Sequence, residues 1–256
     1  MNYVVRGATV SETWLNAISY LVKNNKEAYN LIVEIDNPVE DDSAVRQQVN
    51  NTLKELSFQT IETVANTLFP APYYVKGKER GTFYERFLYA YPILRKIQEN
   101  RNGTYFGRLS AWKYKNSEER GFNQLEETIR KLNREHDNGR GIRVMYEMSI
   151  YDPELDHNNQ MGFPCLSFLS LKIRDGCLDM TAVYRNQFFL KKAYGNYLGL
   201  GRLLQFICDH TNYKLGTLTC IATHAEFEKQ KVKKIYADRL LEIASSREQL
   251  RLEIAE

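Results

Sequence analysis

The chain has 256 residues, of which 43% are hydrophobic and 26% are charged, which is the balance of a soluble globular protein. Its net charge of +3 permits anionic ligands but does not give the strongly basic surface of a dedicated nucleic-acid binder. Residues 1–14 lack the apolar core of a signal peptide, and no apolar run approaches the roughly 18 residues of a membrane span. We therefore expect a cytoplasmic protein without a membrane segment.

In the first half of the chain we expect one buried strand followed by helices. The strand is "YNLIVEIDNP", residues 29–38, which ends in an Asp-Asn-Pro turn. Apolar residues at helical spacing predict helices over residues 41–56, 58–69, 82–100 and 121–141. The alternating stretch "GTYFGRLSAWKYK", residues 103–115, predicts a further strand between the last two helices.

The second half mixes strands with one buried helix. Strands are expected over residues 142–150, 166–173, 178–185 and 214–224, and Asp175-Gly176 predicts a hairpin between the second and third. The mostly apolar stretch 193–213 predicts a long helix, and residues 225–256 predict a charged helical extension. Without an internal repeat or a linker, we expect a single α+β domain over residues 1–256.

Cysteine and histidine spacing gives no indication of a metal site. The cysteines are widely spaced without a CxxC pair, which argues against a zinc ribbon or a disulfide framework and suits a reducing compartment. The histidines show no HExxH or similar spacing. We therefore expect no bound metal.

Polar residues nevertheless stand at the ends of consecutive predicted strands. Cys165 follows Pro164, Arg185 ends an apolar strand, Asn196 opens the buried helix and His224 ends the last strand. Each has an ordinary structural explanation alone: a buried cysteine, a surface ion pair, a helix cap and a hydrogen-bonded core histidine. Together they can also converge on one pocket.

In order and spacing, these residues resemble the thymidylate synthase family. That family carries Pro-Cys at its nucleophile, an Asp-Gly hairpin, a phosphate-binding arginine and an asparagine at the head of a central helix. Pro164-Cys165, Asp175-Gly176, Arg185 and Asn196 fall in that order without a gap. The stretches "YEMSIYDPELD" and "ATHAEFE" extend the resemblance from about residue 143 to residue 226.

The resemblance implies a fold, a chemistry and a set of site residues. The fold is thymidylate synthase-like, with a large mixed sheet flanked by helices and a homodimer formed by sheets back to back. The thiolate of Cys165 would add to C6 of a uracil ring in a pyrimidine nucleoside monophosphate and make C5 a carbon nucleophile. That carbon would take a one-carbon unit, in the family from methylenetetrahydrofolate.

The resemblance also assigns roles to other side chains. Arg185 would bind the phosphate and favour the thiolate, since a nearby cation lowers the pKa of a thiol. Asn196 would read the edge of the base, because an amide suits uracil whereas a carboxylate would favour cytosine. His224 would contact the ribose, and Glu62 in the second predicted helix would organise proton transfer.

Several family positions are changed in this chain. Leu166 replaces the histidine after the nucleophile, and Asn186 replaces the serine after the phosphate arginine but can still donate to the substrate. The paired arginines that reach the partner's phosphate site are reduced to Arg143, with Arg140 out of register. Phe188 replaces the aspartate that grips the folate pterin. Phe188 either stacks on a different planar group or is core, and the apolar run "QFFL" favours core.

By resemblance, the residues that would bind the nucleotide are mostly retained, whereas the aspartate that would bind the folate is replaced. We therefore expect a Cys-dependent C5 one-carbon transferase acting on a pyrimidine nucleotide such as dUMP or UMP, other than a standard dTMP synthase. The alternative is a non-catalytic nucleotide-binding or regulatory protein on the same fold. A third hypothesis gives the C-terminal helix an assembly role, against the simpler expectation that it packs on its own domain.

Overall fold

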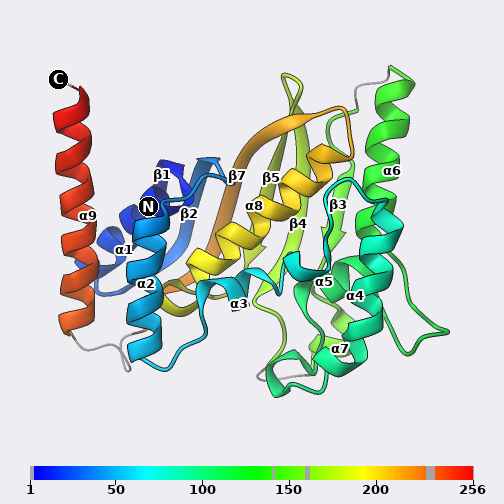
Figure 1. The fold of residues 1–256 in the computed structure, drawn as a ribbon, viewed down its shortest axis with the longest axis horizontal. Helices are drawn as coiled ribbons and strands as arrows, with labels where there is room; N and C mark the ends of the chain where they lie inside the picture. Colours follow the sequence, from blue (N-terminus) through cyan, green and yellow to red (C-terminus); the bar gives the residue numbers. More distant parts are fainter. Residues whose placement is uncertain (1–2, 140–141, 159–161, 229–233, 256) are drawn as a thin grey trace.

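A seven-stranded mixed sheet forms the centre of the molecule in the computed structural model, which describes residues 3–139, 142–158, 162–228 and 234–255 (Figure 1). The strands lie in the order β1-β2-β7-β5-β4-β3, and β6 pairs with β7. Their bounds are β1 Tyr3–Thr9, β2 Glu27–Asn37, β3 Tyr146–Ser149, β4 Leu166–Arg174, β5 Cys177–Tyr184, β6 Gln187–Phe188 and β7 Lys214–Glu226. The β1–β2, β5–β7 and β6–β7 pairs are parallel and the others are antiparallel, so the predicted α+β class with a large mixed sheet is confirmed.

The described helices flank this sheet. They are α1 Val10–Lys23, α2 Ser43–Glu55, α3 Ile61–Ala65, α4 Arg80–Leu94, α5 Tyr105–Ser110, α6 Gln124–Asp137, α7 Pro153–Asp156, α8 Tyr194–Asp209 and α9 Lys234–Ala255. Short 3-10 turns occur at Ala71–Tyr73 and Gln98–Asn100, and a π-helical turn at Phe189–Ala193 leads directly into α8. None of the helices in the described part of the chain is long and apolar enough to cross a membrane.

The structure departs from the predicted elements in three places. Residues 103–115, expected as a strand, form α5 and a turn, because the Thr104 hydroxyl accepts the Gly107 N–H and caps a helix. The strand β1 and the helix α1 precede the first predicted strand and were not expected. The predicted extension from residue 225 begins instead with strand, since β7 pairs with β2 as far as Glu226.

The C-terminal helix α9 packs on its own domain over its described first half. Ala237 and Leu240 are buried, and α9 lies against α1, where Figure 1 shows it at the edge of the molecule. This contact agrees with the simpler expectation for the helix and lends no support to an assembly role.

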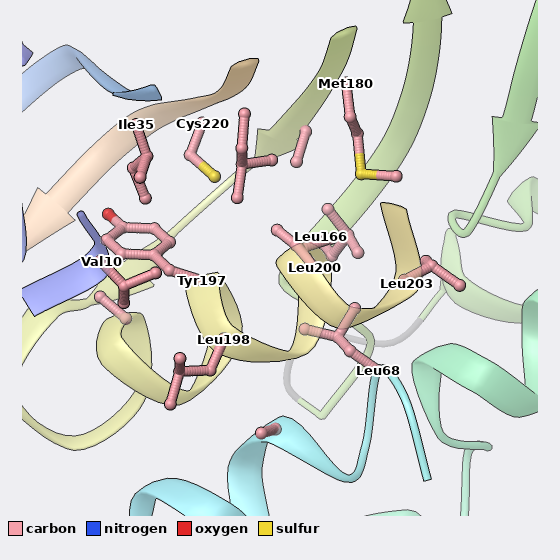
Figure 2. Close-up of a cluster of buried hydrophobic side chains, with 14 of the residues drawn as sticks. Val10, Ile35, Leu68, Leu166, Met180, Tyr197, Leu198, Leu200, Leu203 and Cys220 are labelled. Atoms are coloured by element: carbon pink, nitrogen blue, oxygen red, sulfur yellow. The ribbon is translucent and has the colours of Figure 1, made fainter. Parts of the chain in front are cut away.

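Helix α8 crosses one face of the sheet and forms the middle of the core (Figure 1). Figure 2 shows Tyr197 and Leu200 of α8 on the side of the helix that faces the strands, near Cys220 of β7 and Met180 of β5. These side chains are fully buried, as is nearly the whole of α8. The apolar stretch that predicted a buried helix is therefore explained by cover on both sides, from the sheet and from α3.

Glycines allow other segments to approach the backbone of α8 closely. A Cβ added at Gly195 or Gly199 would lie 2.6–2.7 Å from carbonyl oxygens of α3, at Ile61 and Ala65. A Cβ at Gly201 would lie 1.8 Å from the carbonyl oxygen of Pro38. Helix α8 is thus seated against backbone on two sides, with no space for a methyl group.

Gly201→Ala should therefore destabilise the protein although alanine favours a helix. The new methyl group would overlap a backbone oxygen that cannot rotate away, and overpacking of this kind costs about 1–3 kcal/mol. Urea denaturation should show the loss as a lower midpoint. Gly81→Ala in α4 is the matched control, because nothing lies within 4 Å of its Cβ position. Equal midpoints for the two variants would contradict this packing.

The face of the sheet opposite α8 is only partly covered within one chain. In β5, Leu178, Met180, Ala182 and Tyr184 are buried, whereas the alternating residues Cys177, Asp179, Thr181 and Val183 are half-exposed. Every second side chain of this strand is therefore only partly covered within a single copy.

Candidate functional site

A cavity of about 630 Å³ lies beside the head of α8 and contains the predicted nucleophile. Its walls come from α3 and the loop after it, from the segment around the 3-10 turn Gln98–Asn100 and the start of α5, from the loop before β4 and from residues 186–192. Cys165, Asn186 and Asn196, three of the predicted site residues, line it together. Segments far apart in the sequence therefore meet at this point.

Cys165 is a free, half-buried cysteine directly before the first residue of β4. Its backbone carbonyl accepts the N–H of Arg185 at 2.9 Å, which ties the loop to the end of β5. Burial raises the pKa of the Cys165 thiol, and the charges of Arg185, Lys192 and Lys191 oppose this shift without reversing it. The protonated thiol is therefore the favoured form before a ligand binds.

Arg185 holds the loop that carries the cysteine. Its Nε donates to the carbonyl of Pro164 at 3.1 Å and its Nη2 to the carbonyl of Phe163 at 3.0 Å. The guanidinium carbon also lies 3.6 Å from the centre of the Phe163 ring. The described residues that line the cavity do not include Arg185. The structure thus gives this arginine a positioning contact with the nucleophile loop and does not place it on the cavity wall.

Asn186 connects the cavity to His224. The Nδ1 of His224 lies 2.6 Å from Oδ1 of Asn186, and its Nε2 lies 2.8 Å from a carboxylate oxygen of Glu27. Asn186 lines the cavity, whereas His224 stands behind it on β7, across from β2. His224 therefore orients Asn186, and a direct contact with a ribose would require a ligand to reach past that amide.

Two amides of buried residues on the cavity wall have hydrogen-bonding capacity that the described residues do not fill. Asn196, in the first turn of α8, is 4% exposed, and no hydrogen bond joins its side chain to a described residue. Gln187 is 1% exposed; its Oε1 accepts from the Tyr197 hydroxyl at 3.3 Å, but its Nε2 has no partner in the described structure. Burying a polar group without a partner is costly, so the Gln187 Nε2 indicates a missing partner, and the Asn196 amide is available on the cavity wall to bind a polar ligand.

Glu62 and Arg143 lie away from the cavity. Both carboxylate oxygens of Glu62 accept from Arg202 of α8, at 2.8 and 3.1 Å. The residues of α3 that line the cavity are its neighbours Thr63 and Val64. Arg143 is exposed just before β3 and is not on the cavity wall, and Arg140 falls outside the described residues. Of the predicted set, Cys165, Asn186 and Asn196 line the cavity, Arg185 and His224 contact its lining residues from behind, and Glu62 and Arg143 lie apart.

The sequence reasoning missed two lysines in this cavity. The Nζ of Lys192 donates to Oε1 of Gln59 at 2.5 Å, and the Nζ of Lys191 lies 3.8 Å from the centre of the Phe188 ring. Phe188 itself is half-buried and lines the cavity, so the expectation that it is core is wrong. The available signal was "FFLKKAYGN", in which two cations interrupt an apolar run at the head of a buried helix.

Tyr105 is a further neighbour of the thiol. It lines the cavity from the first turn of α5, the segment that had been predicted as a strand. Burial raises the pKa of its hydroxyl, and hydrogen bonds with the backbone of Leu166 and Cys165 partly offset the shift. The protonated phenol therefore lies beside the backbone of the cysteine.

Comparisons with known proteins relate the chain to proteins named putative thymidylate synthase. No family model matches the chain. The chain is 31% identical over 123 residues to a putative thymidylate synthase of Methanosarcina barkeri, which covers 48% of this chain and 51% of that protein. The chain is therefore similar to a protein named putative thymidylate synthase. A putative thymidylate synthase of Methanothermobacter marburgensis is 21% identical over 233 residues, covering 86% of this chain and 90% of that protein.

For two of the relatives the match covers only about half of the protein. A third relative, a putative thymidylate synthase of Methanocaldococcus jannaschii, is 28% identical over 115 residues. The chain spans about half the length of this protein and of the M. barkeri protein. The comparisons thus support a distant relationship to proteins named putative thymidylate synthase.

Cys165 should react slowly with iodoacetamide at neutral pH. Because burial holds its pKa above the usual value of about 8.5, the rate should rise with a midpoint on the alkaline side of that value. Arg185→Met should move the midpoint higher still, since the charge of Arg185 opposes the shift.

The measurement is alkylation at each cysteine by mass spectrometry across pH. A Cys177→Ser background removes the other half-buried thiol, and Cys208 is an internal control because burial raises its pKa to about 12. A Cys165 midpoint below the usual thiol value would contradict the prediction.

Proposed function

We propose that this protein binds a pyrimidine nucleoside monophosphate beside Cys165 and uses the thiol to activate C5 of the base for one-carbon transfer. The observation that carries the proposal is the buried, unpartnered amide of Asn196 on the same cavity wall as the thiol. An amide can donate to O4 of uracil and accept from its N3–H, which satisfies both of its polar ends. The relatives named putative thymidylate synthase support a nucleotide of this class.

The chemistry follows from a thiolate next to a bound uracil ring. The Cys165 thiol gives its proton to solvent water, and the sulfur lone pair forms a bond to C6 while the C5–C6 π electrons move onto C5 and O4. C5 then bonds to an electrophile or to a solvent proton. Loss of the original C5 hydrogen and expulsion of the thiolate restore the ring. With a proton as the electrophile, the net result is exchange of the C5 hydrogen with water.

The cavity does not fit the folate pterin in the way that the resemblance implies. A pterin needs a hydrogen-bond acceptor for its ring N–H groups, and the position of the expected aspartate is taken by Phe188, with Lys191 over its ring. Neither group accepts a hydrogen bond. The residues at this position therefore do not fit methylenetetrahydrofolate in the family's manner.

Tritium release from [5-³H]UMP or [5-³H]dUMP tests the proposed function. The wild-type protein should release tritium to water, with or without methylenetetrahydrofolate, and Cys165→Ser should abolish the release. Cys177→Ser is the matched control, because Cys177 is half-buried but lies on β5 facing away from the cavity. Release that persists in Cys165→Ser, or its absence from the wild type under every condition, would reject the catalytic role.

A second candidate function is nucleotide binding without catalysis. It is favoured by the raised pKa of the Cys165 thiol and by Glu62, which is engaged by Arg202 and not available in the cavity. A nucleotide that stabilises the folded protein raises its melting temperature in proportion to ln(1 + [L]/Kd). A thermal shift with UMP or dUMP, without tritium release, would select this alternative.

We also propose that the protein is a homodimer through the partly covered face of the sheet. Thr181, Val183, Thr219 and Ile221 form a half-exposed strip of short side chains across β5 and β7 on that face. Such a strip can pack closely against a second copy. Sedimentation velocity should give a dimer that Ile221→Arg dissociates; a monomeric wild type would reject the proposal.

A further inference from the structure

The cations on the described cavity wall are lysines. Lys191 and Lys192 both line the cavity, whereas Arg185 and Arg143, the arginines that the resemblance assigns to the phosphate, do not. The Nε and Nη2 of Arg185 donate hydrogen bonds to carbonyls of the cysteine loop. A phosphate bound beside Cys165 would therefore meet lysine side chains.

Neither lysine is neutralised by an ion pair in the described part of the chain. Lys192 donates to a neutral amide oxygen of Gln59, and Lys191 lies over the ring of Phe188. By contrast, the half-buried Arg80 and the buried Arg108 each pair with a carboxylate. The described charged residues on the cavity wall are these two lysines and Glu99, so the wall carries a net positive charge that favours an anion.

The surroundings of Lys192 disfavour its charged form. Burial lowers its pKa, and the neighbouring Lys191 lowers it further, while Cys165, Glu99 and Glu228 act more weakly in the opposite direction. The carboxylate of Glu228 does not pair with Lys192. It accepts hydrogen bonds from the backbone N–H groups of Leu190 and Lys191 at 3.1 and 2.9 Å. Glu228 thereby occupies the amides at the start of this helical turn, so an anion in the cavity would be bound by the lysine side chains.

We propose that Lys191 and Lys192 bind the phosphate of the nucleotide, in the role that the resemblance gives to Arg185 and Arg143. This inference rests on the proposed function, in that a nucleotide occupies the cavity. Lysine binds phosphate as a point charge with rotatable donors, so the pair needs no fixed planar geometry. Arg185 then remains a positioning residue for the cysteine loop.

The test compares ligands with and without a phosphate on variants with and without the lysines. Calorimetry should show UMP binding the wild type about 10- to 100-fold more tightly than uridine, the range for hydrogen bonds to charged groups. In Lys191→Met/Lys192→Met this advantage should fall to within about 3-fold, with uridine affinity retained. Lys191→Arg/Lys192→Arg should restore it, and Lys54→Met, an exposed lysine of α2, should leave it unchanged. An advantage that survives in the double Met variant would overturn the inference.

A second measurement separates this inference from the proposed function. Acetic anhydride labels lysines, and inorganic pyrophosphate should slow the labelling of Lys191 and Lys192 in the wild type but not that of Lys54. If no nucleotide binds but pyrophosphate still protects both lysines, the proposed function fails and the anion site stands. If UMP binds and neither pyrophosphate nor UMP protects the lysines, the anion site fails and the nucleotide site stands.

Discussion

Arg108→Ala should cost the protein about 3–5 kcal/mol of folding free energy, because it leaves a carboxylate buried without a counter-charge. The guanidinium of Arg108 binds both oxygens of Asp156, at 2.5 and 2.9 Å, and also donates to the carbonyls of Asn102 and Ile150. The two side chains are 8% and 1% exposed. The pair therefore joins α5 and α7 to the segment that carries Asn102 on the cavity wall.

Urea denaturation is the measurement for this prediction. Lys113→Ala is the control, since Lys113 also pairs with a carboxylate, that of Glu154, but at an exposed position where an ion pair contributes little. A double variant, Arg108→Met/Asp156→Leu, should recover part of the loss because it removes the charge as well as its partner. If Arg108→Ala unfolded at the same urea concentration as Lys113→Ala, the buried pair would not contribute the predicted folding free energy.

Asn196→Asp should shift the preference of the cavity from uracil to cytosine. A carboxyl group accepts from the exocyclic amino group of cytosine, whereas it cannot donate to O4 of uracil while ionised. Because Asn196 is buried, the mismatch leaves polar groups unpaired away from water, and UMP binding should fall by about 100-fold or more.

Calorimetry with UMP and CMP measures this change. Asn196→Ala should weaken UMP without creating a preference for CMP, which separates a switch in recognition from a loss of contact. An Asn196→Asp variant that still prefers UMP would show that another group, such as the Gln187 amide, reads the base.

Local chemistry explains what the sequence predicted well. Asp175 adopts φ of 52° and Gly176 φ of 78°, as their hairpin requires, and the turn between β4 and β5 was predicted from these two residues. The continuous apolar run of α8 identified a helix with cover on both sides. The family spacing brought Cys165 and Asn196 into one cavity, because a fixed hairpin and a fixed helix start determine their separation.

The predictions that failed depend on contacts between distant segments. The assignment of Glu62 depended on the rotation of a five-residue helix about its axis, which Arg202 of α8 and the close packing on Gly195 determine. The missed α5 depends on a cap by Thr104 and on burial of Phe106 beneath α4. The rotation of α3 and the cap of α5 both depend on tertiary contacts, which the pattern of apolar residues in the sequence does not reveal.

The seating of α3 on the glycines of α8 also bears on how the cavity binds a ligand. Because backbone rests on backbone at Gly195 and Gly199, the wall that carries Thr63 and the wall that carries Asn196 have little freedom to separate. A ligand entering such a preorganised cavity loses less entropy in ordering the protein. We therefore expect ligand binding to change the backbone dynamics of α3 and α8 little. The amide groups of these helices should stay protected from hydrogen exchange until the protein unfolds globally.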